Sequence, residues 1–133
     1  MKTLLSILAT CLSMLVLTPS ALSTGGLYGN AYVKSTATGL GNGSSWTDAY
    51  TSLQEAIDKA IPGDVICVAQ GTYLPTHILG DDTLRNRTFY INKSIVLYGG
   101  FIGDPGTEGS FEERNPGLYV TTLSGDVGVA GVV

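Results

Sequence analysis

The sequence is poor in the residues that build disulfides, metal sites and nucleophilic catalytic sites. It contains two cysteines and one histidine among 133 residues. Cys11 lies in an N-terminal apolar run that we expect to be removed, so the mature chain keeps Cys67 alone and has no intramolecular disulfide. Cys67 falls short of the ligand number of a metal site, and His77 has no Cys or Ser motif beside it. We therefore interpret Cys67 as an apolar interior side chain and His77 as a surface residue.

Positive charge is also scarce. The whole chain has seven Lys and Arg against eleven Asp and Glu, and removal of the N-terminal run with Lys2 leaves a net charge of −5. This acidic balance argues against nucleic acid and anionic membranes as partners. No apolar run of membrane-spanning length follows residue 23, so we expect no membrane span in the mature chain.

The N-terminus has the pattern of a secretory signal peptide. Lys2 gives a basic start, and residues 4–17 form an uncharged apolar run of roughly 14 residues, shorter than the about 20 that span a bilayer. Ala21 and Ser23 are small residues at three and one positions before a cut. We predict that residues 1–23 are a signal peptide and that the protein is secreted, extracellular or at the cell surface. An N-terminal membrane anchor is the alternative.

Glycine is abundant in what remains. All 18 glycines follow residue 23, in a mature chain of 110 residues, which is about twice the usual share of ~7%. Together with many Thr, Val and Tyr residues, this composition indicates a β-rich, turn-rich protein. The residue patterns predict short strands over residues 31–34, 65–69, 88–91, 94–98 and 121–124. Gly99 and Gly100 are expected to end the fourth of them.

One helix is expected, over residues 52–61. Ser52 and Glu55 have the spacing of a capping box, and Pro62 with Gly63 ends the pattern. One apolar face recurs at helical intervals. Its members are Leu53, Ala56, Ile57, Ala60 and Ile61.

The strand over residues 65–69 should have one buried face. Alternation points Ile66 and Val68 inward and places Val65 and Cys67 outward or under a loop. Ile66 and Ile95 are 29 residues apart, and Ile95 and Leu123 are 28 apart. These intervals fit stacked coils with loop insertions, and they fit equally a chance spacing of strands in a small sandwich.

Several motifs follow one another in a recognisable order. A Gly/Ser loop with Trp46 precedes the helix, and Gly63-Asp64, the strand and Gly71-Thr72-Tyr73 with Pro75 follow it; the stretches TFYINKSIVLYGGF and TTLSGDVGV come later. In this order the chain from Tyr32 to Asp126 resembles the N-terminal part of secreted bacterial right-handed parallel β-helix proteins, of the pectate-lyase-like architecture. The resemblance concerns the fold and says little about activity.

The resemblance implies a mainly β fold, with an N-terminal capping helix and the first two or three coils of a right-handed parallel β-helix. Residues 24–51 would form a Gly-rich lead, the first strand and a loop, and residues 52–133 the helix and coils. The open end of a coil stack exposes strand edges, so the helix face would cover the first coil. Trp46 and Tyr50 would extend that lid.

The chain reaches Val133 after two or three coils, fewer than a stack capped at both ends normally has. We interpret it as the N-terminal part of a longer protein and expect self-association through the open end of the β-helix. The expected function is a non-catalytic extracellular or cell-surface module, acting as an adhesin or scaffold. One alternative is the N-terminal segment of a polysaccharide lyase or glycoside hydrolase whose site lies beyond this chain. The other is a carbohydrate-binding module.

No catalytic, cofactor-binding or metal residue is assigned, and no cofactor is expected. A polysaccharide or cell-surface glycan is the expected partner. Calcium would need six to eight oxygen ligands, which Asp81 and Asp82 do not supply, so all loop acids are interpreted as solvated charge. Asp126 is left open as a contributor to a site on further coils. The remaining candidates are the acids Asp104, Glu108, Glu112 and Glu113, the bases Arg85, Arg87 and Lys93, and the sequons at Asn42, Asn86 and Asn92, which we read as coincidental.

Ten aromatic side chains could include a platform on which a sugar stacks, although packing in the core, cap and turns explains most of them. They are Tyr32, Trp46, Tyr50, Tyr73, Phe89, Tyr90, Tyr98, Phe101, Phe111 and Tyr119.

Overall fold

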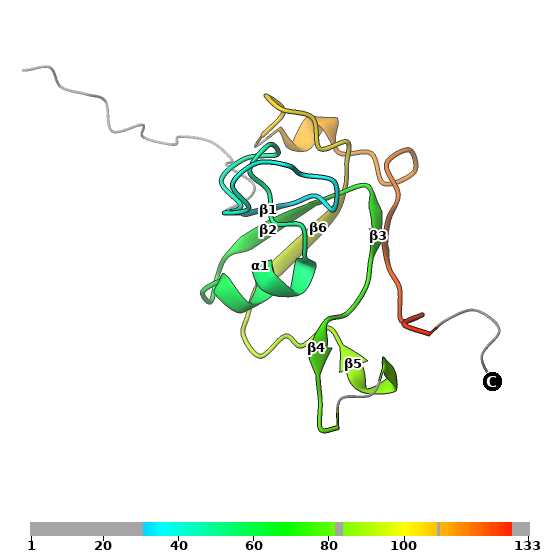
Figure 1. Cartoon of the computed structure of the whole chain (residues 1–133). Coiled ribbons are helices and arrows are strands. Elements are labelled where there is room, and N and C mark those ends of the chain that lie inside the picture. The colour runs from blue at the N-terminus through cyan, green and yellow to red at the C-terminus, as the bar shows by residue number, and fades with distance from the viewer. Residues whose placement is uncertain (1–30, 82–83, 109, 129–133) are drawn as a thin grey trace, which may run out of the picture.

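A computed structural model of the chain describes residues 31–81, 84–108 and 110–128 (Figure 1). The expected signal peptide over residues 1–23 and its cleavage point therefore lie outside the described residues. In chain order the elements are β1 (Ala31–Val33), α1 (Leu53–Lys59), β2 (Val65–Ala69), β3 (Gly71–Tyr73), β4 (His77–Ile78), the 3-10 turn η1 (Leu84–Asn86), β5 (Arg87–Thr88), β6 (Val96–Phe101), the 3-10 turn η2 (Phe111–Glu113) and β7 (Thr121–Leu123).

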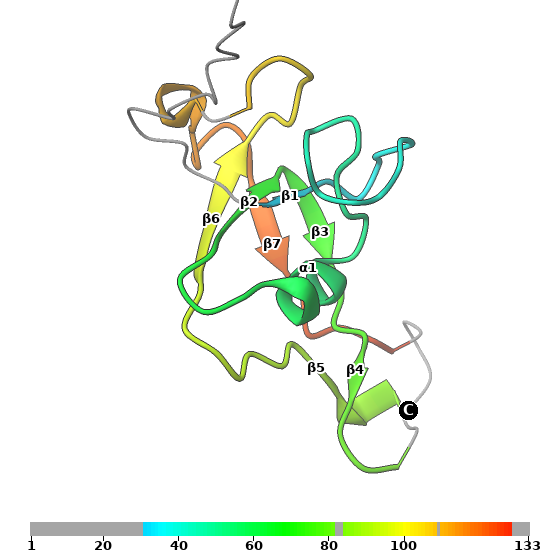
Figure 2. The ribbon, with the colours of Figure 1, turned by 90° about the vertical axis from the view of Figure 1, so that its left-hand side faces the viewer.

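Two parallel sheets organise the chain. The first has the order β1-β2-β6 and the second pairs β3 with β7. In the first sheet Ile66 pairs with Ala31 on one side and Leu97 on the other. The chain passes from β2 directly into β3, and later from β6 through a loop into β7. Each later strand is thus added beside the earlier strand of the same sheet, β6 beside β2 and β7 beside β3 (Figure 2). A third, antiparallel sheet of two residues per strand joins β4 and β5.

Helix α1 is confirmed, with a shorter span than expected. The Ser52 hydroxyl accepts a hydrogen bond from the Glu55 backbone N–H at 3.4 Å, as a capping residue does. The helix ends at Lys59, and Ala60 is already extended, with φ −62° and ψ 148°. Ile61 therefore leaves the apolar face and is 66% exposed, so its expected place on that face was wrong.

The helix covers one face of the first sheet. It packs on β1 and β2 with Leu53, Ala56 and Ile57 buried. Ile66 and Val68 point to this face and are buried, which confirms the predicted alternation. We call this cluster the helix-side core: Val33, Tyr50, Leu53, Ala56, Ile57, Ala60, Ile66, Val68 and Tyr73.

A second cluster fills the opposite face of the same sheet. Cys67 is buried there, as expected for a side chain under a loop. Trp46 also lies here, so its expected place in the lid over the helix side was wrong, whereas Tyr50 does join the helix side. The Trp46 ring lies 4.7 Å from that of Tyr32 and 5.7 Å from that of Phe101. We call this cluster the loop-side core: Tyr32, Trp46, Ala49, Cys67, Ala69 and Phe101.

The strand expected over residues 88–91 was wrong apart from Thr88. Strand β5 ends at Thr88, and no strand follows before β6. The reason is a side chain, because both backbone groups of Tyr90 are bonded to the amide of Gln54. A side-chain amide thus takes the place of a neighbouring strand at this position.

The fourth expected strand begins and ends later than predicted. Strand β6 continues through Gly99 and Gly100 to Phe101, and these glycines do not end it. Gly100 has φ +89°, in a stretch where the register against β2 shifts. A Cβ on Gly100 would lie 2.9 Å from Pro116, and one on Gly99 would lie 2.8 Å from Thr121 Cβ. These two glycines therefore permit close packing of the following loop and β7.

The strand pairing also shows that the intervals of 29 and 28 residues do not join equivalent positions of successive coils. Ile66 pairs with Leu97 and not with Ile95. Leu123 belongs to the second sheet, where it pairs with Tyr73. The similar intervals therefore compared positions that are not equivalent, while the strand over residues 121–124 is itself confirmed as β7.

The outer edge of β1 is closed by the loop that precedes α1. The Tyr32 N–H donates to the Gly43 carbonyl at 3.0 Å, and the Tyr50 N–H donates to the Tyr32 carbonyl at 2.9 Å. The Lys34 N–H donates to the Tyr50 carbonyl at 2.8 Å. Strand β6 forms the other edge of this sheet.

Candidate functional site

The most exposed aromatic group among the described residues lies beside the small β4–β5 sheet. The His77 ring stacks on the Tyr90 ring, with centroids 4.6 Å apart and planes 13° from parallel. Tyr90 is 41% exposed, and His77 is half-buried. We call these two residues the aromatic pair. The expectation of a surface position for His77 is confirmed in part, and the residue lies in strand β4.

Gln54 of α1 fixes the position of Tyr90. Its amide oxygen accepts from the Tyr90 N–H at 2.9 Å, and its amide nitrogen donates to the Tyr90 carbonyl at 3.0 Å. The same nitrogen donates to Asp58 at 2.8 Å. Gln54 is only 3% exposed, so these bonds lie where water competes little for them. The exposed ring is thus carried by a backbone held to a helix.

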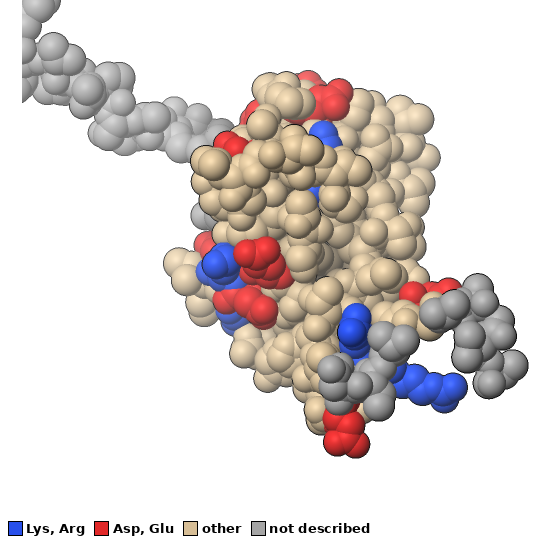
Figure 3. Space-filling model, in the orientation of Figure 1, with Lys and Arg blue, Asp and Glu red and all other residues tan. Residues whose placement is uncertain are grey.

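Four apolar side chains within three residues of His77 or Tyr90 in the sequence are exposed. They are Leu74, Ile78, Leu79 and Ile91. Arg85 and Arg87 are exposed on the same hairpin, where blue side chains project at the lower edge of Figure 3. An aromatic face with apolar neighbours and nearby donors can bind a flat, amphipathic ligand.

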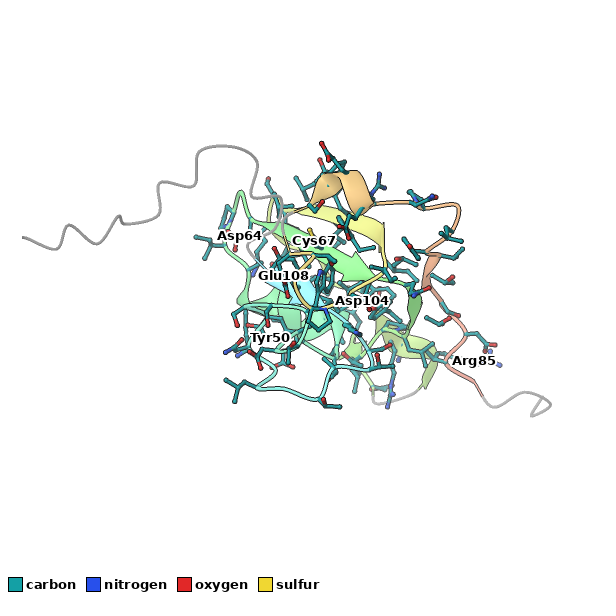
Figure 4. All side chains as sticks on the ribbon, turned by 90° about the horizontal axis from the view of Figure 1, so that it is seen from above. Tyr50, Asp64, Cys67, Arg85, Asp104 and Glu108 are labelled. Carbon is teal, nitrogen blue, oxygen red and sulfur yellow. The ribbon has the colours of Figure 1, made fainter. Side chains whose placement is uncertain are left out.

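Among the bases and acids considered from the sequence, Arg85, Arg87 and Asp81 share the β4–β5 hairpin. Figure 4 shows Arg85 at the opposite side of the molecule from Asp64, with Glu108 nearer the middle. Asp81, Asp104, Glu112 and Glu113 are exposed, as expected for solvated loop charge, and Asp82 lies outside the described residues. Within residues 31–81, 84–108 and 110–128, no three His, Cys, Asp or Glu side chains are grouped so that they could hold a metal ion.

Glu108 has a structural role that the sequence did not reveal. Its carboxylate accepts hydrogen bonds from the backbone N–H of Trp46 at 2.9 Å and the backbone N–H of Gly106 at 2.7 Å. It therefore ties the loop after β6 to the loop before α1, and its expected role as mere solvated charge was wrong. The indole N–H of Trp46, by contrast, is buried and has no hydrogen-bond partner in the described part of the chain.

Lys93 and Arg114 also bond to backbone carbonyls. The Lys93 ammonium donates to the carbonyls of Asp58 and Ala60, at 3.0 and 2.9 Å, at the C-terminal end of α1. The positive charge is favourable there because the helix dipole is negative at that end. Arg114 donates to the Gly99 carbonyl at 2.6 Å and lies over the Tyr98 ring, 5.6 Å from its centroid.

Burial makes the Cys67 thiol a poor nucleophile. Desolvation raises its pKa from 9.0 to about 11, although the positive charge of Arg114 acts in the opposite direction. The thiolate is the reactive form of cysteine, so the folded protein holds Cys67 in its unreactive form at neutral pH. Desolvation likewise raises the pKa of Tyr73, opposed by hydrogen bonding to Ser35.

The asparagines of the three sequons and Asp126 lie in turns or on the surface. The Asn42 side chain accepts from the Ser44 N–H at 3.0 Å, and the Asn86 side chain donates to the Asp81 carbonyl at 3.0 Å. Asn92 is exposed. Asp126 is exposed, and its backbone N–H donates to the Ser124 hydroxyl at 3.1 Å.

Packing accounts for most of the ten aromatic side chains, as expected. Tyr32, Trp46, Tyr50, Tyr73 and Phe101 are buried, and Phe89, Tyr98, Phe111 and Tyr119 are half-buried. Tyr90 alone among these ten is exposed, and it is also distinguished by the stacking on His77 and the bonds to Gln54.

No family model, curated protein or solved structure matches this chain. None of the helices within the described residues is long and apolar enough to cross a membrane.

Proposed function

We propose that the chain is a non-catalytic extracellular or cell-surface module, adhesin-like or scaffold-like, built as the N-terminal part of a right-handed parallel β-helix. The observation that carries the proposal is the repeated order of the strands. Strands β2 and β3 are followed later by β6 and β7, each laid parallel to its predecessor. Such stacking is how repeat proteins extend a core one unit at a time.

The roles of the charged groups support a scaffold. Glu108 and Lys93 bond to backbone groups that join separate loops and elements. Asp64 accepts from the Ile61 N–H at 2.9 Å just after α1. Catalysis on a polysaccharide needs acid and base groups held at matched positions, whereas these groups hold the backbone.

The test is to express the whole 133-residue chain in a secreting bacterial host. We expect the product outside the cytoplasm with Thr24 as its first residue, and no turnover of uronate polymers with or without Ca²⁺. Unsaturated-product absorbance and reducing ends would be measured together. A cytoplasmic product that begins at Met1 would contradict export, and turnover lost in Asp81→Asn would contradict a non-catalytic module.

Carbohydrate binding is a second candidate, favoured by the aromatic pair. A pyranose ring presents C–H groups to an aromatic face and hydroxyls at its rim, which suits an exposed tyrosine with polar neighbours. Binding of the purified protein to an array of neutral and acidic glycans should be lost in Tyr90→Ala. Ile91→Ala, which removes a nearby exposed apolar side chain but no ring, should bind normally. Equal binding by both variants would exclude the aromatic pair as the site.

The enzymatic alternative concerns any longer parent protein. Its signature would be a cluster of acidic side chains on the outer face of coils that follow β7. A parent sequence with such a cluster would favour a lyase or hydrolase, and a C-terminal sorting or anchoring segment would favour the surface module.

A further inference from the structure

The surroundings of the three sequons differ. Their asparagines are Asn42, Asn86 and Asn92. A glycan is attached to the side-chain nitrogen of such an asparagine. In Asn86 this nitrogen donates to the Asp81 carbonyl at 3.0 Å, and the residue is half-buried. Asn42 and Asn92 are exposed. Because a glycosylated asparagine lies at the surface of a secreted protein, the structure favours these two positions over Asn86.

Asn92 lies on an exposed stretch that is anchored to the helix. Residues 89–95 connect β5 to β6 without forming a strand or helix (Figure 1). The neighbouring Lys93 holds this stretch, because its ammonium group donates to two carbonyls at the C-terminal end of α1. Ser94, the third residue of the sequon, is exposed. The asparagine is thus presented at the surface by a backbone with a fixed position.

The exposed ring of the aromatic pair lies two residues before Asn92. Two residues of chain span at most about 7 Å between Cα atoms, and both Tyr90 and Asn92 are exposed. A sugar attached to the Asn92 amide is therefore within reach of the Tyr90 ring. The equivalent position before Asn42 holds Leu40, which is exposed and has no ring. Only Asn92 of the two exposed asparagines thus has an exposed aromatic partner at this spacing.

The Tyr90 ring is held in place before any sugar is attached. Gln54 bonds to both backbone groups of Tyr90, and the His77 ring covers one face of the Tyr90 ring. A side chain that is already fixed loses little further freedom when a ligand packs on it. The remaining exposed surface of Tyr90 suits a pyranose ring, whose C–H groups pack on an aromatic face.

We propose that Asn92 is an N-glycosylation site and that the first sugar of its glycan stacks on Tyr90. For Asn92 this replaces the interpretation of the sequon as coincidental. The inference rests on export, as in the proposed function. It differs from the binding of an external glycan, because the sugar is covalently attached to the chain.

The attachment is a group transfer from a lipid-linked sugar diphosphate, made by a transferase of the exporting cell. A bond forms between the Asn92 side-chain nitrogen and the anomeric carbon of the donor sugar. The bond between that carbon and the diphosphate oxygen breaks, and the lipid diphosphate leaves with the electron pair. The amide nitrogen gives up one proton to the transferase.

Expression of the full chain in a secreting host that carries out N-glycosylation tests the attachment. We expect a secreted product whose Asn92 peptide carries a glycan in mass spectra. Ser94→Ala keeps the asparagine but removes the sequon, and should abolish the modification. A secreted product with unmodified Asn92 would overturn the inference and leave the proposed function standing. A cytoplasmic product that begins at Met1 would overturn both.

Melting temperatures of the secreted proteins test the stacking. Asn92→Gln lacks the glycan and should melt about 4 °C below the wild type, because the contact between sugar and ring is lost. The same substitution should cause no shift when Tyr90 is already alanine. Ile91→Ala is the matched background, since it removes an exposed apolar neighbour and keeps the ring, and there the shift should persist. Equal shifts in the Tyr90→Ala and Ile91→Ala backgrounds, or no shift in the wild type, would overturn the stacking.

Discussion

The two faces of the β1-β2-β6 sheet are built in different ways. The helix side is largely aliphatic, and α1 supplies most of its cover from one short stretch of chain. The loop side is largely aromatic, and its members come from loops and strands spread between Tyr32 and Phe101. Burial is nearly complete on both sides. A local helical pattern on one side and contacts between distant segments on the other therefore bury their side chains equally well.

The loop side depends on bonds between distant parts of the chain. The backbone N–H of Trp46 donates to the Glu108 carboxylate, 62 residues away. The Lys34 ammonium bonds to the Gly103 carbonyl at 2.7 Å, across 69 residues. Closing such long loops costs chain entropy before the contacts form.

The largest effect is expected on the helix side. Ile57→Asp would place a charge at a position with 0% exposure in the helix-side core, and should lower the free energy of unfolding by about 4 kcal/mol or more. Lys59→Asp, at an exposed position of the same helix, should cost about 1 kcal/mol or less. Denaturant melts measure both. Equal losses would mean that the helix face is wrongly assigned.

The second test concerns the loop side. Gly103 and Gly106 both have positive φ, +80° and +88°. A Cβ on Gly103 would lie 2.7 Å from the Ala69 Cβ, whereas one on Gly106 would meet nothing within 4 Å. Both alanine variants share a backbone cost of about 1–2 kcal/mol. Gly103→Ala should lose a further ~1–3 kcal/mol from overpacking. Equal melting temperatures of the two variants would show that the loop-side core accommodates the added methyl group without loss of stability.

The third test concerns the contact between α1 and the aromatic pair. Gln54→Leu keeps an apolar body but leaves the Tyr90 N–H and carbonyl without their partner, and should cost about 2 kcal/mol. It should also accelerate hydrogen exchange at the Tyr90 amide. Glu55→Leu, at the exposed neighbouring position, is the control and should leave that amide protected. Unchanged exchange in Gln54→Leu would contradict the proposed anchoring.

The fourth test is a pH dependence on the loop side. The Cys67 thiol has a pKa of about 11 in the folded protein against 9.0 for a free thiol. Below pH 9 both states keep the proton and stability does not depend on it. Between pH 9 and 11 the unfolded chain releases a proton that the folded chain retains, so the free energy of unfolding falls as pH rises.

Cys67→Ala removes this dependence, and Tyr73, whose pKa is also raised, contributes equally to both proteins. The difference in stability between wild type and Cys67→Ala should therefore shift against the wild type over this interval. Parallel curves from pH 8 to 11 would contradict the burial of the thiol.

The features set by neighbouring residues could be predicted from the sequence. The helix start at Ser52 and the alternation of Ile66 and Val68 follow from local spacing and were confirmed. The side of the sheet that Trp46 occupies and the loss of a strand at Tyr90 both depend on distant partners. Spacing alone does not encode these partners.

The candidate site was predicted less well than the fold. His77 was expected at the surface, and Tyr90 was one of ten aromatics with no mark of its own. The buried amide of Gln54, which fixes Tyr90, sits one position away from the predicted apolar stripe, where a polar residue normally faces water. A glutamine next to that stripe was the only available signal, and it has no specific meaning without the fold.

The position of Cys67 has a consequence for how the protein is made. Cys67 lies on the central strand, with Tyr32 as its neighbour on one side and Tyr98 on the other. Tyr98 is added to this side only 31 residues further along the chain, and Phe111 of the same cluster follows later still. Until then the thiol is open to oxidants and to thiols of other chains. Slow maturation in an oxidising medium would therefore yield covalently linked by-products, and a reductant present only during refolding should suppress them.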